Sequence, residues 1–213
     1  MPQLLNNIRN KLLLFTGSGT TLVLLSALFG FWGADLSLNR FEDLISHEVV
    51  EERLTLQTLS DFKKQVQEWK NVLIRGSDPK QLQKYWGKFE QQEAKIQQQS
   101  AELLNIVRND EALSKLREFK QAHSEMGTAY RRGLQAFRDG GFVAAVGDKA
   151  VKGIDRAPTK LLDEAAVLIA NDSSVKSDLA VSTAYTAITY GLIFIAIAVA
   201  LAFVVFVYNV PTH

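Results

Sequence analysis

The sequence predicts an all-α protein, an antiparallel up-down four-helix bundle flanked by two transmembrane helices. Three observations support this fold class. Two long stretches without charge lie near the ends of the chain, the middle is rich in Gln, Lys, Glu, Leu and Ala, and only 4 prolines occur among 213 residues. Such a composition favours long helices over sheet. Apolar residues in the middle also recur at alternating spacings of three and four, which places them on one face of each helix.

The second apolar stretch, 184–208, is the clearest element. No Asp, Glu, Lys or Arg follows Asp178. About 20 apolar residues cross a hydrocarbon core of roughly 30 Å, and Tyr190 and Tyr208 stand where membrane helices carry aromatic belts. A buried helix of a soluble protein rarely stays apolar on every face for so long. We therefore predict a transmembrane helix over 184–208.

The first apolar stretch, 12–33, is long enough to span a bilayer and also lacks charge. A cleaved signal peptide is the alternative. However, the stretch is longer than a signal core, and it offers Phe31 and Trp32 where a cleavage site needs small residues. We therefore predict an uncleaved transmembrane helix here as well.

Basic residues decide the predicted orientation. Arg9 and Lys11 precede the first stretch, and mostly acidic residues follow it. Because positive flanks stay in the cytoplasm, we expect residues 1–11 and the short tail 209–213 on the cytoplasmic side. Residues 34–183 then form a domain on the outer side.

Four helices are expected in this outer domain, over about 34–74, 79–108, 111–139 and from about 143 into the second span. Short breaks between helices suit antiparallel neighbours in an up-down bundle. Their apolar stripes consist, in chain order, of Leu59, Phe62, Val66, Trp69 and Leu73; Leu82, Trp86, Phe89, Ile96, Leu103 and Val107; Leu116, Phe119, Met126, Tyr130 and Phe137; and Val151, Ile154, Leu161, Ala165, Leu168, Val175 and Leu179.

Turn and capping residues mark the breaks between these helices. Gly76 and the pair Gly140–Gly141 are expected to end helices, because glycine is common just past a helix end. Asp78 (or Ser77) and Asp110 are expected to begin the next ones as N-caps. In the fourth helix, Gly153 and Pro158 predict a kink or a delayed start, because proline removes a helical hydrogen bond.

The sequence carries no recognisable catalytic motif. There is no glycine-rich phosphate loop, nucleophile elbow or HExxH segment, and the absence of cysteine excludes disulfides and thiolate chemistry. A net charge of +1 provides no basic stripe of the kind that binds nucleic acid. We therefore expect no enzyme, no cofactor, no metal site and no nucleic-acid partner.

Two histidines lie in the outer domain, His47 and His123. Neither follows a Glu by three residues, as a di-iron bundle requires. His123 could bind haem or act as a pH switch. We favour a core histidine that is hydrogen-bonded to a neighbour, since one isolated histidine meets little of what a metal site needs.

Charged and aromatic residues collect near the predicted far ends of the outer helices. Aromatic faces beside fixed cations suit a small anion or a zwitterion. Helix ends also attract charges for capping and dipole reasons, and the two tryptophans lie on apolar stripes, so a structural role is favoured over ligand binding. The residues are Glu68, Trp69, Lys70, Arg75, Asp78, Lys84, Tyr85, Trp86, Arg131, Arg132, Asp155 and Arg156.

Two segments carry a resemblance to a known family. VQEWKNVLIRGSDPKQLQKYW (66–86) and AVKGIDRAPTKLLDEAA (150–166) resemble outer-domain segments of bacterial methyl-accepting chemotaxis proteins. The order of span, helical domain and span is similar to the N-terminal sensory region of these receptors, which holds a periplasmic four-helix-bundle ligand-binding domain. Receptors of this family continue into a HAMP linker and a methylated coiled coil. The present sequence is expected to be either the sensory fragment of a longer receptor or a free-standing sensor.

The resemblance implies a multi-pass protein of the bacterial inner membrane whose residues 34–183 lie in the periplasm. It also implies a homodimer that binds a small-molecule ligand or a periplasmic binding protein. Ligand binding would displace the last helix, and with it the second span. Carried over on the two motifs, the implied ligand-binding residues are Trp69, Lys70, Arg75, Asp155, Arg156 and Thr159.

Other outputs and roles stay open. Sensory modules of this kind also serve as the input of histidine kinases and diguanylate cyclases. From another class, the chain could be a non-sensing, membrane-anchored helical protein that serves for oligomerisation or for docking of a partner.

Overall fold

The computed structural model describes residues 8–209, and this range is helical with turns and no strand. The all-α prediction is therefore confirmed. The predicted cytoplasmic tails, 1–11 and 209–213, lie mostly outside the described residues. The chain divides into two units, one formed by the segments up to Asp43 and from Lys176 onward, the other by Leu44–Val175.

Unit 1 consists of helix α1 (Ile8–Asp43) and the second half of helix α6 (Arg156–Asn209). Both helices are long and apolar enough to cross a membrane by length and composition. In the most apolar 18-residue segment of the first helix no residue is buried, and in that of the second helix only 6% are. These apolar side chains therefore do not form a protein core. One ring contact joins the two helices, Phe29 and Phe194, with centroids 5.8 Å apart.

Helix α1 passes into helix α2 (Val49–Arg75) through a π-helical turn, Leu44–Glu48. The sequence predicts one uninterrupted helix over about 34–74, and the π turn is a local departure from it. Such turns accommodate an extra residue within a helix and occur often at functional positions. Here the turn lies at the boundary between the two units.

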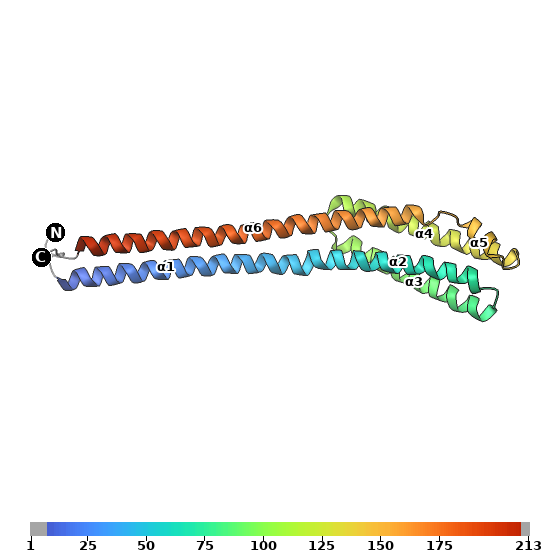
Figure 1. The fold of residues 1–213 in the computed structure, drawn as a ribbon, viewed down its shortest axis with the longest axis horizontal. Coiled ribbons are helices and arrows are strands. Elements are labelled where there is room, and N and C mark those ends of the chain that lie inside the picture. Colours follow the sequence, from blue (N-terminus) through green and yellow to red (C-terminus); the bar gives the residue numbers. More distant parts are fainter. Residues whose placement is uncertain (1–7, 210–213) are drawn as a thin grey trace. The chain divides into compact units, whose positions relative to one another are not determined.

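Unit 2 contains α2, α3 (Pro79–Ile106), α4 (Asp110–Asp139), α5 (Ala144–Ala150) and the beginning of α6. Helices α2 and α3 are antiparallel neighbours joined by a tight turn (Figure 1). Asp78 caps α3 as predicted, since its carboxylate accepts from the backbone N–H groups of Lys80 and Gln81. The predicted cap Asp110 is wrong. Asn109 has the extended backbone of an N-cap and accepts from the Ala112 N–H at 2.9 Å, so Asp110 is the first helical residue.

A helix begins next to Val143 as predicted, but it is not continuous with the helix that leads to the second span. Helix α5 ends after 7 residues, a turn with Gly153 at φ 77° follows, and α6 begins at Arg156. Pro158 then lies in the first turn of α6, where its missing N–H leaves no helical hydrogen bond unmade. The delayed start that Gly153 and Pro158 predict is thus what the structure has.

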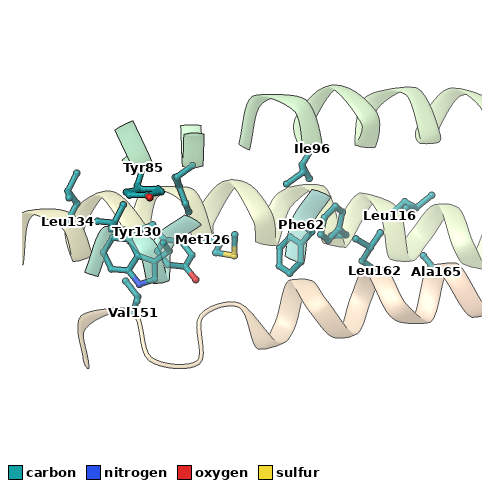
Figure 2. Packing of buried hydrophobic residues seen from close by; sticks show 14 of the residues in the cluster. Phe62, Tyr85, Ile96, Leu116, Met126, Tyr130, Leu134, Val151, Leu162 and Ala165 are labelled. Atoms are coloured by element: carbon teal, nitrogen blue, oxygen red, sulfur yellow. The ribbon is translucent and has the colours of Figure 1, made fainter. Parts of the chain in front are cut away.

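The core of unit 2 is built from α2, α3, α4 and α6. Figure 2 shows Leu162 and Ala165 of α6 pointing toward Phe62 and Leu116. Near the α2–α3 turn the core is aromatic. The ring of Trp69 packs edge-on against that of Tyr130, with the ring centroids 5.1 Å apart. Other fully buried side chains are Phe89, Ile96, Leu103, Phe119, Met126, Phe137 and Ile169. Val175 and Leu179, which the predicted stripe of the last helix includes, are instead both 66% exposed.

Away from that turn the core becomes polar on three of its helices. The buried polar residues are Glu48, Glu51, Thr55, Thr58, Asp61, Gln65, Gln99, Ser100 and His123. All of them belong to α2, its π turn, α3 or α4, whereas the buried residues that α6 contributes here, Leu162, Ala165 and Ile169, are apolar. Buried polar groups need hydrogen-bond partners, so buried directional contacts hold α2, α3 and α4 together, whereas the buried contacts of α6 are apolar packing.

Candidate functional site

An open groove of about 890 Å³ lies between the start of α4 and the start of α6. One ion pair bridges it: Lys115 Nζ lies 2.9 Å from Glu164 Oε2. That hydrogen bond raises the pKa of Lys115 and lowers the pKa of Glu164. The groove is lined by Glu111, Lys115, Asp155, Arg156, Thr159, Lys160, Asp163, Glu164, Val167 and Leu168, so it presents charges of both signs above a small apolar floor.

The turn before α6 brings three predicted site residues into this groove. Asp155, Arg156 and Thr159 all line it. The Thr159 hydroxyl donates to the backbone carbonyl of Asp155 at 2.6 Å, which fixes its rotamer. The charged ends of Asp155 and Arg156 are therefore the groups from this motif that can face a ligand.

Trp69 is not at the groove. It is 3% exposed in α2, between Tyr130 and Trp86, and an added side chain at Gly133 would contact its indole. Within the described part of the chain, its buried indole N–H has no hydrogen-bond partner. Trp69 is thus a core residue, as its position on the apolar stripe predicts, and it offers no accessible surface to a ligand.

Arg75 and Lys70 are both exposed residues of α2 and do not line the groove. Arg75 donates to the Tyr85 hydroxyl at 2.6 Å and to the side-chain oxygen of Asn71 at 3.3 Å. Lys70 is exposed one turn earlier. The two resemblance motifs therefore do not form one site. Asp155, Arg156 and Thr159 line the groove, Trp69 is buried in the core, and Lys70 and Arg75 are exposed on α2.

His123 lies at the centre of the polar core. Its Nε2 lies 2.7 Å from Gln65 Oε1 and its Nδ1 lies 2.7 Å from Gln97 Nε2, so one imidazole connects α4 to α2 and α3. Phe62 and Phe119 lie against the ring. Burial lowers the pKa of His123 to about 4, although the charge of Glu93 opposes this. The imidazole is neutral at pH 7, and both nitrogens are used within the core, as expected for a core histidine.

Asp61 is the second polar centre, and sequence reasoning missed it. Its side chain is 2% exposed, lies 2.8 Å from Lys95 Nζ and accepts from Gln99 Nε2 at 3.0 Å. Burial alone would raise its pKa, but hydrogen bonds from Lys95, Gln99 and Lys64 outweigh this and lower it. Asp61 and Gln65 directly precede Phe62 and Val66, two residues of the predicted apolar stripe of α2. This position beside the stripe is the signal in the sequence that the two polar side chains are buried.

No cluster of three or more His, Asp or Glu side chains that could hold a metal ion occurs within residues 8–209. Three charged pairs among the described residues of unit 2 instead join two helices, namely Lys95–Asp61, Lys115–Glu164 and Arg131–Glu93. Arg131, for example, makes two hydrogen bonds to the Glu93 carboxylate at 2.6 and 2.9 Å, which raises the pKa of Arg131.

Comparison with known proteins identifies one informative relative. Over 153 residues the chain is 35% identical to the methyl-accepting chemotaxis protein CtpH of Pseudomonas aeruginosa, and the match covers 72% of this chain. The chain is homologous to a chemoreceptor. The resemblance predicted from the two motifs is confirmed, and it supports a chemotaxis-type receptor sensory module. The match covers 27% of the length of CtpH. No family model and no solved structure matches the chain.

The homology to a chemoreceptor and the two apolar helices together indicate that the chain is associated with a membrane. The apolar side chains of unit 1 agree with this, because they are exposed instead of packed into a core, Phe31 and Leu28 among them.

Proposed function

We propose that the chain is the sensory module of a chemotaxis-type transmembrane receptor, anchored in the bacterial inner membrane. The observation that carries the proposal is the 35% identity to a methyl-accepting chemotaxis protein over 153 residues. In this proposal residues 12–33 and 184–208 span the membrane, residues 34–183 form a periplasmic four-helix bundle, and both termini are cytoplasmic. The module is a homodimer without cofactor or catalytic activity, and it does not bind nucleic acid.

The ligand site that we propose is the groove between α4 and α6. Its lining includes Asp155 and Arg156, and the neighbouring Lys115–Glu164 pair offers an exchangeable contact of each sign. A small molecule that carries both an acidic and a basic group fits these charges. Trp69 supports the site only indirectly, as part of the core.

The distribution of polar contacts supports signal transmission by displacement of α6. Buried hydrogen bonds connect α2 to α3 through Asp61 and both of them to α4 through His123. The buried face of α6 carries only apolar side chains, which can shift against their neighbours by about 1–2 Å between discrete packings. Helix α6 continues without interruption to Asn209. A ligand that binds one packing more tightly than the other would bias this shift.

Ligand binding to the full-length chain in lipid nanodiscs tests the proposal. Amino acids, organic acids and phosphate are added in turn, and unfolding is followed by tryptophan fluorescence in a Trp32→Phe background, which leaves Trp69 and Trp86 as reporters. A true ligand raises the melting temperature by mass action. The double variant Asp155→Asn, Arg156→Gln should abolish the increase, whereas the exposed control Lys149→Gln should retain it.

The alternatives have separate readouts. If no compound raises the melting temperature and the chain still self-associates, the non-sensing helical docking protein is supported instead. If a ligand binds, fusion of the chain to the signalling part of a chemoreceptor, of a histidine kinase or of a diguanylate cyclase identifies the output. A ligand-dependent change in only the kinase or cyclase fusion would contradict the chemotaxis proposal.

A further inference from the structure

The charges of unit 2 are segregated, although the whole chain has a net charge of only +1. Segment 69–89 contains 5 basic residues and 1 acidic residue, and segment 131–156 contains 6 basic residues and 3 acidic ones. Together they have an excess of seven positive charges. The remainder of unit 2 has an excess of six negative charges. Composition of the whole chain conceals this asymmetry, because the two parts nearly cancel.

Parts of the two basic segments, around residues 73–76 and 137–147, meet at one end of unit 2. An added side chain at Gly76, after α2, would lie 3.0 Å from the ring of Phe137, near the end of α4. One at Gly147, in α5, would lie 2.5 Å from Leu73 of α2. We call this end, formed by the α2–α3 turn, the first turns of α3 and the segment 140–153, the turn end.

Cations at the turn end cluster without acidic partners. The ring of Tyr85 has the Arg75 guanidinium carbon 5.1 Å, Lys84 Nζ 5.4 Å and Lys88 Nζ 5.6 Å from its centroid. Lys84 and Lys88 are four residues apart on α3, a spacing at which like charges destabilise a helix. Among the residues described, no carboxylate pairs with these three cations, and the single acid of the segment, Asp78, is used as the α3 cap. The cluster is therefore unfavourable in the isolated chain and favours a negatively charged partner.

Exposed apolar residues lie at the same end. Phe142 is 39% exposed with a left-handed backbone (φ 63°), a conformation rare for an aromatic residue, and its ring stands edge-on to Phe137. Val143 and Val146 of the same segment and Ile74 of α2 are also exposed. Strained backbone that presents an exposed aromatic marks functional sites. An aromatic centre with a charged rim is the usual composition of a protein interface.

We propose that the turn end is a docking surface for an acidic partner protein, with Phe142 as the apolar anchor and Arg75, Lys84 and Lys88 as the cationic rim. A second copy of this chain does not fit, because two turn ends would bring like charges together. A small anion would make no use of the exposed apolar residues. The surface is separate from the α4–α6 groove, so the proposal goes beyond the proposed ligand site and does not depend on it.

Defined polymers test the surface on the full-length chain in zwitterionic-lipid nanodiscs. The probes are poly-glutamate, a random glutamate–tyrosine copolymer of equal charge, monomeric glutamate, and vesicles that contain phosphatidylglycerol. We expect the copolymer to bind about tenfold more tightly than poly-glutamate, because a hot-spot aromatic contributes on the order of 1–2 kcal/mol. Binding should weaken as salt is raised.

Matched variants complete the test. Lys84→Glu with Lys88→Glu should weaken copolymer binding at least tenfold, whereas Lys63→Glu with Arg117→Glu, two exposed cations in the acidic part of unit 2, should not. Phe142→Asn keeps a residue that tolerates the left-handed backbone, and it should remove the advantage of the copolymer over poly-glutamate. The proposal is overturned if both double variants bind alike, if Phe142→Asn changes nothing, if monomeric glutamate binds as tightly as the polymers, or if the vesicles bind through Lys84 and Lys88.

Discussion

At the scale of single residues, His123 has the clearest physical consequence. Gln65 of α2, Gln97 of α3 and Phe119 of its own helix surround the ring, and Glu93 is the charged group that acts on it. In the folded state burial lowers the pKa of His123 to about 4, whereas an unfolded histidine titrates near 6.5. The unfolded chain therefore binds a proton first as the pH falls.

We predict that this histidine makes unit 2 acid-sensitive. The stabilisation is complete above about pH 6.5 and is lost as the pH falls from 6.5 to 4, by roughly 3 kcal/mol in total, because one pKa unit is worth about 1.4 kcal/mol. Urea unfolding of the full-length chain, followed by Trp69 and Trp86 fluorescence, measures the slope. His123→Gln keeps a hydrogen-bonding side chain that does not titrate, so its stability should fall much less over this range, with only the carboxylates contributing near pH 4. An equal slope in both proteins would contradict the assignment.

Asp61 leads to a prediction of a different kind. Its buried carboxylate pairs with the half-exposed Lys95 and accepts from the buried Gln99, so replacement by Asn removes a charge-assisted contact and leaves Lys95 without this partner. We expect Asp61→Asn to lower the free energy of unfolding by about 1–3 kcal/mol. Asp163→Asn, at an exposed position, is the control and should change it by less than about 0.5 kcal/mol. Equal urea midpoints for the two variants would show that Asp61 has no structural role.

At the scale of helices, two glycines differ in how closely other residues approach their Cα atoms. A side chain at Gly133 of α4 would clash with Val151 and touch Trp69, whereas one at Gly87 of α3 meets nothing within 4 Å. We predict that Gly133→Ala destabilises the chain by about 1–3 kcal/mol through overpacking. Gly87→Ala should stabilise it by up to about 1 kcal/mol through helix propensity. Thermal unfolding of both variants decides this, and a stabilised Gly133→Ala would refute the packing of Val151 on α4.

Helix periodicity was enough to predict α2, α3 and α4, because their apolar residues follow a single stripe over many turns. Phe62, Trp69, Phe89 and Phe119 are all buried as that stripe requires. The α5–α6 boundary was predicted less well. Gly153 and Pro158 reveal that something interrupts the helix, but the separate seven-residue helix depends on packing of Gly147 against Leu73, a contact between distant segments.

The candidate site was only half predictable for a similar reason. A motif in sequence fixes which residues are neighbours along one helix, not which helix faces them. Thus Asp155, Arg156 and Thr159 do line one groove, while Trp69 turns inward and Arg75 turns toward Tyr85. The partners that complete the groove, Lys115 and Glu164, are ordinary surface charges in the sequence, and only the fold brings them within 2.9 Å.

At the scale of the whole molecule, the decisive prediction concerns the two sides of the membrane. Arg9 and Lys11 precede the first apolar span, and mostly acidic residues follow it. The predicted orientation depends on these flanks and places residues 1–11 and 209–213 in the cytoplasm. Because the chain has no cysteine, single cysteines can report on this without interference.

We predict that Ser77→Cys, in the exposed α2–α3 turn, reacts with a membrane-impermeant maleimide in intact spheroplasts. Gln3→Cys and Thr212→Cys, in the two terminal segments, should react only after the membrane is permeabilised. Labelling of Thr212→Cys in intact spheroplasts together with Ser77→Cys would mean that α6 does not cross the membrane. A shift of α6 within unit 2 could then not reach the cytoplasm, and the proposed route of the signal would be wrong even if the ligand groove were real.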